Sequence, residues 1–286
     1  MPEGDTIWRV AARLRERLEG RTVKRVRPES LGRLRGLRLE TVEPVGKHLL
    51  MRFSGGWTLH SHMRMTGSWH LYRPADRWLR PERFARAVLD FGEWVAVCFS
   101  APVLELVRDP QTSIGHLGPD VLMPQFPLES VVRRARAVGP SPLGELLLDQ
   151  RVCCGIGNVY KCEALWQSRL DPWAPSSELD DAQLGELFEM ARSLMTRNIR
   201  PRSGFARTFP GSGRAAVHGR RGRPCPRCGA SIEARQQGEQ GRWTYWCPRC
   251  QTTAQAPPPA LRAPRSRVRP PHEADFVGTP EGDPGM

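Results

Sequence analysis

Residues 37–62 read LRLETVEPVGKHLLMRFSGGWTLHSH, and this stretch decides the first half of the fold. Short runs of alternating apolar and polar residues are separated by Gly46 and by Gly55-Gly56, as in β-strands joined by tight turns. The pattern predicts strands over Leu37–Val42, His48–Phe53 and Trp57–His62.

The same pattern continues on both sides of this stretch. Five further strands are predicted over Thr22–Arg27, Ser68–Tyr72, Ala85–Phe91, Trp94–Phe99 and Val103–Val107. A helix over Asp5–Leu18 precedes them, because apolar residues recur there at helical spacing. Eight short strands in about 90 residues predict a β-sandwich or barrel with this helix packed against it.

The second half of the chain changes to helical periodicity. Residues 203–216, rich in Gly, Ser and Arg, are predicted to form a loop. A run of strands followed by a run of helices indicates an α+β fold, with a seam near residues 119–127. The predicted helices are Leu128–Val138, Pro142–Arg151, Asn158–Gln167 and Asp180–Arg197.

Composition limits the classes of protein to which the chain can belong. Its 43 basic and 30 acidic residues give a net charge of +13, which points to a polyanionic partner, most often nucleic acid. No apolar run approaches the roughly 20 residues that cross a bilayer. The start, Met1-Pro2-Glu3-Gly4-Asp5, has neither the basic nor the apolar segment of a secretory signal. We therefore expect a cytoplasmic protein with reduced thiols and no membrane partner.

Two cysteine pairs, Cys225-Pro-Arg-Cys228 and Cys247-Pro-Arg-Cys250, are separated by 18 residues. Four thiolates match the tetrahedral preference of Zn²⁺, and the spacing is that of a zinc ribbon. Because four protein ligands leave no open position, we expect one structural Zn²⁺ ion. The alternative, two redox-active pairs, lacks a surrounding thioredoxin-like pattern. The other cysteines are predicted to be buried apolar residues: Cys98, Cys153, Cys154 and Cys162.

The positive charge is concentrated around these cysteines. Residues 196–251 contain twelve arginines and two glutamates, so ten of the thirteen net charges fall there. This basic segment, which also contains Trp243, Tyr245 and Trp246, is predicted to grip the DNA backbone; a solvated surface is the alternative. We expect four parts: a β-sandwich domain over 1–120, a helical domain over 121–216, a zinc finger over 217–251, and a disordered, proline-rich tail over 252–286.

Several motifs follow one another in a fixed order. They are Met-Pro-Glu-Gly at 1–4, Gly46-Lys47-His48-Leu49-Leu50, His62-Met63-Arg64-Met65-Thr66-Gly67, Leu117-Gly118-Pro119-Asp120, Leu148-Asp149-Gln150, Gly155-Ile156-Gly157-Asn158-Val159-Tyr160 and the four-cysteine finger. Over residues 2 to 251 the chain resembles the formamidopyrimidine-DNA glycosylase and endonuclease VIII family. The Pro-Glu-Gly-Asp start and Gly67-Ser68-Trp69 resemble its endonuclease VIII branch in actinobacteria. The resemblance implies a two-layer β-sandwich with flanking helices, then a helix–two-turn–helix domain with a zinc finger.

The resemblance also implies an activity. Such an enzyme flips a damaged base, here an oxidised pyrimidine, cuts its N-glycosidic bond and nicks the abasic strand. Its partner would be damaged double-stranded or abasic-site DNA, bound by a monomer at the bacterial nucleoid. The alternatives are a non-catalytic zinc-ribbon DNA-binding protein on the same scaffold and an RNA-binding zinc protein.

Three residues are the catalytic candidates. Removal of Met1 would make Pro2 an N-terminal secondary amine, which can attack C1′ and form an iminium for β- and then δ-elimination. The pKa of an α-amino group is about 8, below that of a lysine side chain, so more of it is nucleophilic at neutral pH. By the resemblance, Glu3 protonates the deoxyribose ring oxygen. Lys47, one of only three lysines, corresponds to a family lysine on a hairpin that reaches the target phosphate and sugar. Asp5 and Thr6 stand where the family often has a second Glu.

Five more residues are candidates for DNA contacts. Arg64, Met65 and Thr66 correspond to the loop that fills the gap left by the flipped base, where an apolar wedge lessens the cost of unstacking. A position in the core is the alternative for Met65. Asn158 follows a glycine turn that permits close backbone approach to phosphate, and Arg242 corresponds to the finger arginine that grips the same phosphates.

Overall fold

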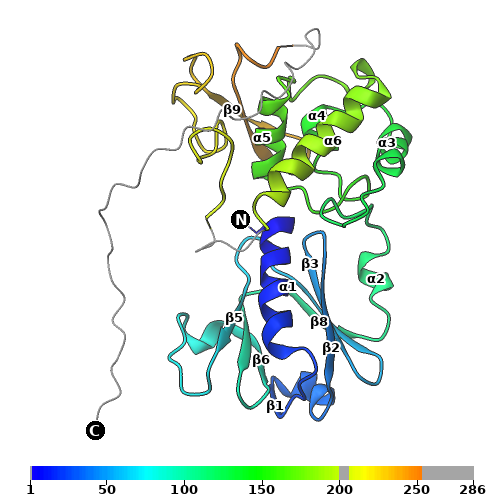
Figure 1. Ribbon diagram of the computed structural model, residues 1–286, viewed down its shortest axis with the longest axis vertical. Helices are drawn as coiled ribbons and strands as arrows, with labels where there is room; N and C mark the ends of the chain where they lie inside the picture. The colour runs from blue at the N-terminus through cyan, green and yellow to red at the C-terminus, as the bar shows by residue number, and fades with distance from the viewer. Residues whose placement is uncertain (1, 200–205, 253–286) are drawn as a thin grey trace, which may run out of the picture. The chain divides into compact units, whose positions relative to one another are not determined.

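The computed structural model describes residues 2–199 and 206–252 (Figure 1). The predicted tail, apart from Thr252, and the first residues of the predicted loop lie outside the described residues. The residues that are described belong to one compact unit. Within them, every helix is too short or too polar to cross a membrane.

Two four-stranded antiparallel sheets form the first half of the chain. One has the order β2-β3-β4-β8, with β2 at Leu39–Val45, β3 at His48–Phe53, β4 at Trp57–His62 and β8 at Val103–Val107. The other has the order β1-β6-β7-β5, with β1 at Arg25–Arg27, β6 at Ala85–Asp90, β7 at Val95–Phe99 and β5 at Ser68–Tyr72. All eight predicted strands are confirmed. Because they form two sheets, the sandwich is correct and the barrel is wrong.

Helix α1 (Gly4–Leu18) packs against both sheets of this sandwich (Figure 1). Its apolar stripe is buried in the core that the two sheets share, as the helical spacing predicts. Trp8, on another side of the helix, packs against the core of the helical half. Helix α1 therefore contacts both halves of the chain, and Pro2 and Glu3 lie directly before its first residue.

The second half is helical, as predicted. Helices α3 (Leu128–Ala137), α4 (Leu143–Leu146), α5 (Asn158–Gln167) and α6 (Asp181–Thr196) surround a second core, and the short α2 (Gln111–Ile114) precedes them. Further short 3-10 helices are Glu29–Leu34, Glu82–Phe84 and Ser176–Glu178.

Helix α4 is shorter than predicted, and the expectation of a helix over 142–151 is wrong at its C-terminal end. The apolar run continues past Leu146, but Asp149 Oδ1 accepts a hydrogen bond from Arg151 N at 2.9 Å. Such local side-chain bonds favour a turn over a helix. The turns that follow lead into α5, which gives the helix–two-turn–helix arrangement that the resemblance implies.

The zinc-finger segment forms a β-hairpin of β9 (Glu233–Gln237) and β10 (Arg242–Trp246). It is attached to the helical half through Glu163 of α5, whose side chain is buried. The Glu163 carboxylate accepts hydrogen bonds from three successive backbone N–H groups, at 2.8, 3.0 and 2.9 Å; they belong to Ala216, Val217 and His218. This carboxylate fixes the start of the finger on the helix that begins at Asn158.

We expect Glu163→Gln to lower the free energy of unfolding by about 2–3 kcal/mol, because an amide cannot accept all three bonds and leaves a buried donor unpaired. Denaturant unfolding followed by circular dichroism measures this change. Glu186→Gln, at an exposed position of α6, is the matched control and should change stability by less than about 0.5 kcal/mol. Equal stability of the two variants would contradict the role of Glu163.

Candidate active site

Glu3, the residue before α1, is fully buried at the N-terminus of α5. Its carboxylate accepts hydrogen bonds from Val159 N at 2.9 Å and, more weakly, from Tyr160 N at 3.5 Å. The free N–H groups of a helix N-terminus stabilise a negative charge. Burial nevertheless raises the pKa of Glu3, opposed by the cations of Arg207 and Lys47. The group can therefore keep a proton at higher pH than an exposed glutamate.

The glycines of the turn before α5 make room for the N-terminus of the chain. A Cβ on Gly157 would overlap the carboxyl group of Glu3, and a Cβ on Gly155 would press on Val121. Gly155 has φ of 102°, and its carbonyl accepts a hydrogen bond from Gly4 N at 3.0 Å. The prediction that this turn lets backbone approach phosphate is not tested. The structure shows that its glycines admit Glu3 and Gly4.

Pro2 and Lys47 lie in the same region, as predicted for catalytic candidates. Pro2 is half-buried and directly precedes Glu3. Lys47 is in the turn between β2 and β3, where Gly46 has φ of 58° and donates its N–H to Asp120 Oδ2 at 2.7 Å. A Cβ at Gly46 would collide with Cys154, so the turn needs glycine to bring Lys47 against the helical half.

The charge of Lys47 interacts with both halves of the chain. Burial lowers the pKa of Lys47 to about 8, the charge of Glu3 opposes this shift, and Arg242 adds to it. The charge of Lys47 therefore interacts with two candidates from separate segments, Glu3 and Arg242. Their roles in catalysis and DNA binding stay predictions.

Asn158 of α5 contacts the finger at the residue next to Arg242. Asn158 Nδ2 donates a hydrogen bond to the carbonyl of Trp243 at 2.8 Å, and Arg242 is the neighbouring residue at the start of β10. One turn further along α5, the buried Lys161 Nζ donates to Thr244 Oγ1 at 2.6 Å. Asn158, one predicted phosphate ligand, is thus bonded to the backbone of the residue that follows Arg242, the other.

The loop between β4 and β5 presents the predicted wedge. Met65 is 62% exposed, so the alternative of a core methionine is wrong. Arg64 has φ of 44°, and Thr66 Oγ1 donates to Ser100 O at 3.0 Å. A Cβ on Gly67 would overlap the backbone of Met63, which explains the glycine at the end of the loop. The loop is built to expose one apolar side chain between two polar ones.

The four finger cysteines form one cluster, with all four sulfur atoms within 4.8 Å of one another. Cys225 and Cys250 Sγ are 3.9 Å apart, and Cys228 and Cys247 Sγ are 3.5 Å apart. A tetrahedron with Zn–S bonds of about 2.3 Å has sulfur atoms about 3.8 Å apart. The donor set and its size therefore fit a zinc ion. The remaining cysteines are buried, as predicted: Cys98, Cys153, Cys154 and Cys162.

A group of histidines beside the wedge loop was not identified from the sequence as a set. His48 Nδ1 and His60 Nε2 are 2.7 Å apart, and His60 Nδ1 lies 2.7 Å from Glu105 Oε1. His62 Nδ1 accepts a hydrogen bond from Arg64 N at 3.1 Å. Burial and neighbouring histidines lower the pKa of His48 to about 3, so it is neutral near pH 7. The sequence feature that could have indicated this group is the spacing of His60 and His62, which are two residues apart on one predicted strand.

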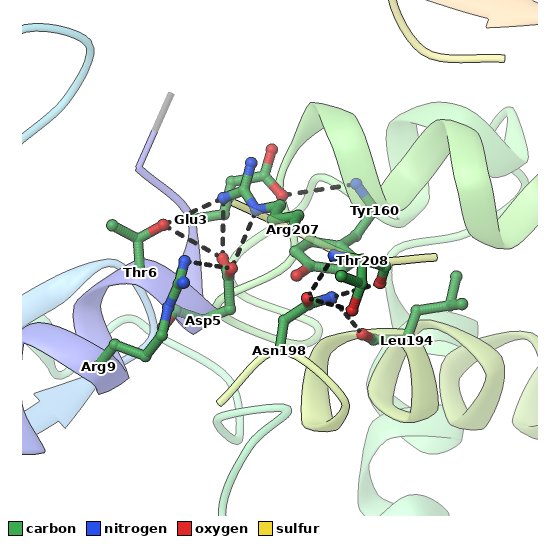
Figure 2. Close-up of polar contacts among 9 residues, drawn as sticks. All are labelled: Glu3, Asp5, Thr6, Arg9, Tyr160, Leu194, Asn198, Arg207 and Thr208. Carbon is green, nitrogen blue, oxygen red and sulfur yellow. Dashed lines mark hydrogen bonds and ion pairs between the residues drawn. The ribbon is translucent and has the colours of Figure 1, made fainter. Parts of the chain in front are cut away.

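Asp5 and Arg207 form a second group that the sequence did not reveal (Figure 2). Asp5 is fully buried and accepts hydrogen bonds from Arg207 Nε at 2.9 Å and Nη2 at 2.8 Å. Arg9 Nη2 adds a third contact at 3.2 Å. The two residues of the main pair are separated by about two hundred positions, so no local pattern could have joined them.

The ionisation of Lys47 gives a direct test of this geometry. We expect Lys47 to titrate near pH 8, and its pKa to fall further in Glu3→Gln, because the charge of Glu3 stabilises the ammonium form. With only three lysines in the chain, ¹³C-dimethyl-lysine NMR resolves the signal, and Lys47→Arg assigns it. The same titration in wild type and in Glu3→Gln would contradict the proximity of the two groups.

Comparison with known proteins places this site in a family. Residues 1–102 match the formamidopyrimidine-DNA glycosylase N-terminal domain, and residues 117–209 match the formamidopyrimidine-DNA glycosylase H2TH domain. The chain is similar to a probable endonuclease 8 2 of Streptomyces coelicolor, with 42% identity over 92% of this chain and 98% of that protein. It is 36% identical to the DNA-(apurinic or apyrimidinic site) lyase Nei2 of Mycolicibacterium smegmatis, over 89% of this chain and 100% of the relative.

Solved structures show the same fold. The Lactococcus lactis Fpg in complex with abasic-site DNA has a TM-score of 0.74 at 22% identity, over 88% of this chain and 100% of that one. The MutM (Fpg) protein of Thermus thermophilus has a TM-score of 0.72 at 30% identity, over 89% and 100%. These likenesses agree with the sandwich, the helix–two-turn–helix arrangement and the cysteine cluster described above. The chain therefore belongs to the formamidopyrimidine-DNA glycosylase and endonuclease VIII family, in its endonuclease VIII branch.

Proposed function

We propose that this protein is a bifunctional DNA glycosylase and abasic-site lyase that removes oxidised pyrimidines. Pro2, freed by loss of Met1, attacks C1′ of the damaged nucleoside and forms a C–N bond as the bond from C1′ to the base breaks. The C1′–O4′ bond then breaks as the ring oxygen takes up a proton, which leaves an iminium between the Pro2 nitrogen and C1′. With this iminium as the electron sink, loss of a proton from C2′ expels the 3′ phosphate by β-elimination, and loss of a second proton, from C4′, expels the 5′ phosphate by δ-elimination. Glu3 supplies the proton to the sugar ring oxygen.

The buried carboxyl group of Glu3 directly beside Pro2 is the observation that carries this proposal. A general acid must lie within reach of the reacting group and hold a proton near the working pH. Burial raises the pKa of Glu3, while the amides of α5 fix its position. An acid next to a secondary amine, with Lys47 nearby to bind a sugar or phosphate oxygen, is suited to opening and cleaving a deoxyribose.

Family membership supports the activity, and the relatives support the choice of lesion. The two bacterial relatives are named as an endonuclease 8 and an abasic-site lyase. One solved relative holds DNA with an abasic site. The assignment to the endonuclease VIII branch favours oxidised pyrimidines over purines as the bases that are removed.

DNA contacts follow from the residues around this centre. We propose that Met65 enters the gap left by the flipped base, flanked by Arg64 and Thr66, because its exposed apolar side chain suits a stacked cavity. Asn158 and Arg242 are proposed to bind the phosphates beside the lesion, which the bond from Asn158 to the residue after Arg242 supports. The protein is proposed to act as a monomer at the nucleoid. The four-part domain division also stays a prediction.

A zinc ion bound to the four finger cysteines would stabilise the hairpin that begins with Arg242. The four thiolates are Cys225, Cys228, Cys247 and Cys250, and they would leave no coordination position for substrate. We therefore assign the ion a structural role. Trp243 of the hairpin, the residue after Arg242, in turn accepts a hydrogen bond from Asn158 of α5 through its carbonyl.

Borohydride trapping on DNA tests the proposed nucleophile. Protein that has lost Met1 should form a covalent adduct with a duplex that contains one abasic site, and Pro2→Gly should reduce the yield at least about tenfold, because a primary amine replaces the proline ring nitrogen. Glu3→Gln should bind the DNA but remove thymine glycol at least about 100-fold more slowly, consistent with the usual loss on removing a general acid.

The controls separate the enzyme from a binding protein. Lys24→Gln alters a lysine remote from the proposed chemistry and should be trapped as wild type is. If correctly processed wild-type protein binds the duplex but forms no adduct, the non-catalytic alternative is correct. Preferential binding to RNA over damaged DNA would favour the third alternative.

Loss of zinc should weaken DNA binding. Replacing Cys225 and Cys228 by Ser removes two ligands, so the finger loses its fold and DNA affinity falls at least about tenfold as phosphate contacts are lost. Metal analysis and fluorescence anisotropy with duplex DNA measure the two effects. Cys98→Ala, outside the cluster, should keep one zinc ion per chain. Unchanged affinity in the zinc-free double variant would contradict the proposed role of the finger.

A further inference from the structure

Arg207 joins three separate parts of the protein around the catalytic N-terminus (Figure 2). Its guanidinium binds both oxygens of Asp5 in the first turn of α1, at 2.9 and 2.8 Å, and contacts Thr6 Oγ1 at 3.2 Å. It also lies over the ring of Tyr160 in the first turn of α5, 5.2 Å from the ring centroid. Arg207 therefore touches the two helices between which Glu3 is held.

The segment that carries Arg207 is itself fixed to a third helix. Asn198, just past the end of α6, accepts a hydrogen bond from Thr208 N at 2.8 Å and donates through Nδ2 to Thr208 O at 3.1 Å. The same Nδ2 group donates to Leu194 O within α6 at 3.0 Å. Because Thr208 follows Arg207 directly, Asn198 fixes the backbone beside Arg207, while Asp5 binds the guanidinium at the other end of the side chain.

The arginine also balances an unfavourable pair of charges. Glu3 and Asp5 are both fully buried, two positions apart, and their like charges repel. The side chain of Arg207 is only 15% exposed, so its charge is weakly screened by water. Among the groups that oppose the effect of burial on the pKa of Glu3, Arg207 acts most strongly.

We propose that Arg207 is a positioning residue for base removal, holding the first turn of α1 on α5 so that Glu3 and Pro2 meet the same sugar. This inference rests on the proposed function and assigns Arg207 to the step that uses Glu3. Asp5 then serves as the anchor for Arg207 and not as a second acid, because guanidinium groups occupy both of its oxygens. The segment 206–209 thereby becomes part of the catalytic apparatus.

The two reactions of the enzyme should depend on Arg207 to different degrees. Opening the sugar of an intact damaged nucleoside needs a proton from Glu3 on the ring oxygen, whereas a preformed abasic site exchanges with an open-chain aldehyde in which the ring is already open. A misplaced general acid should therefore slow base removal more than strand cleavage. A residue with a merely structural role would slow both reactions together as the protein lost stability.

Single-turnover kinetics on two duplexes test this difference. For Arg207→Gln we expect removal of thymine glycol to fall about 10- to 100-fold, as displacement of a catalytic group by about an ångström does, and cleavage of a preformed abasic site to fall less than about threefold. The alkaline limb of base removal, where Glu3 loses its proton, should move to higher pH, because loss of the Arg207 cation raises the pKa of Glu3 further.

Two variants distinguish the effects of the charge and position of Arg207 from a general loss of stability. Arg9→Gln removes an arginine that contacts the same Asp5 from within α1, and it should leave the alkaline limb in place. The double variant Asp5→Asn/Arg207→Gln replaces the buried ion pair by two amides, which avoids an unpaired buried charge. It should unfold at a higher temperature than Arg207→Gln alone and keep the slow base removal, while its alkaline limb shifts less than in Arg207→Gln, because loss of the Asp5 charge lowers the pKa of Glu3.

The outcomes distinguish this inference from the function on which it rests. Equal losses in both reactions, with an unmoved pH profile, or full activity of the double variant would overturn the role of Arg207 and leave the glycosylase intact. Wild-type protein that acts on neither duplex would instead overturn the proposed function. Slow base removal with near-normal abasic cleavage and a shifted alkaline limb supports the positioning role.

Discussion

The structure depends on the burial of one carboxyl group, that of Glu3. Removing a carboxylate from water is costly unless hydrogen bonds and cations replace the solvent. Here the amides of Val159 and Tyr160 supply the hydrogen bonds, and Lys47 and Arg207 supply positive charge. Because these groups come from three distant segments, the chain must bring its halves together before Glu3 can be accommodated. The fold and the proposed catalytic centre thus depend on the same contacts.

Helix α5 organises the surroundings of that centre. Nine of its ten residues are buried, so it has no solvent face of the usual amphipathic kind. Its first turn holds Glu3, Asn158 reaches Trp243 of the finger, and Glu163 binds the backbone that leads into the finger. Helix α5 therefore contacts the proposed acid, carries the proposed phosphate ligand Asn158 and binds the finger.

Local patterns in the sequence were sufficient for most of the fold. All eight strands and the bounds of α5 followed from periodicity and from Gly and Pro punctuation, and the cysteine spacing identified the metal cluster. The end of α4 was wrong because a side-chain bond at Asp149 outweighs the apolar run. The pairing of Asp5 with Arg207 could not be predicted, since arginines are common throughout the chain and nothing local distinguishes this one.

The pairing of Asp5 with Arg207 changes how the positive charge of residues 196–251 is interpreted. The ten excess charges of residues 196–251 suggested a surface for DNA, yet some of these arginines have internal partners. Arg207 binds Asp5, while Arg227 and Arg235 lie over the rings of Trp166 and Trp173, 4.0 and 4.1 Å from the ring centroids. Planar guanidinium groups suit such stacked and bidentate contacts, whereas a compact ammonium suits a site whose charge must respond to its neighbours. The contrast between Arg207, held in a fixed fork, and Lys47, whose pKa is lowered to about 8, follows this difference in chemistry.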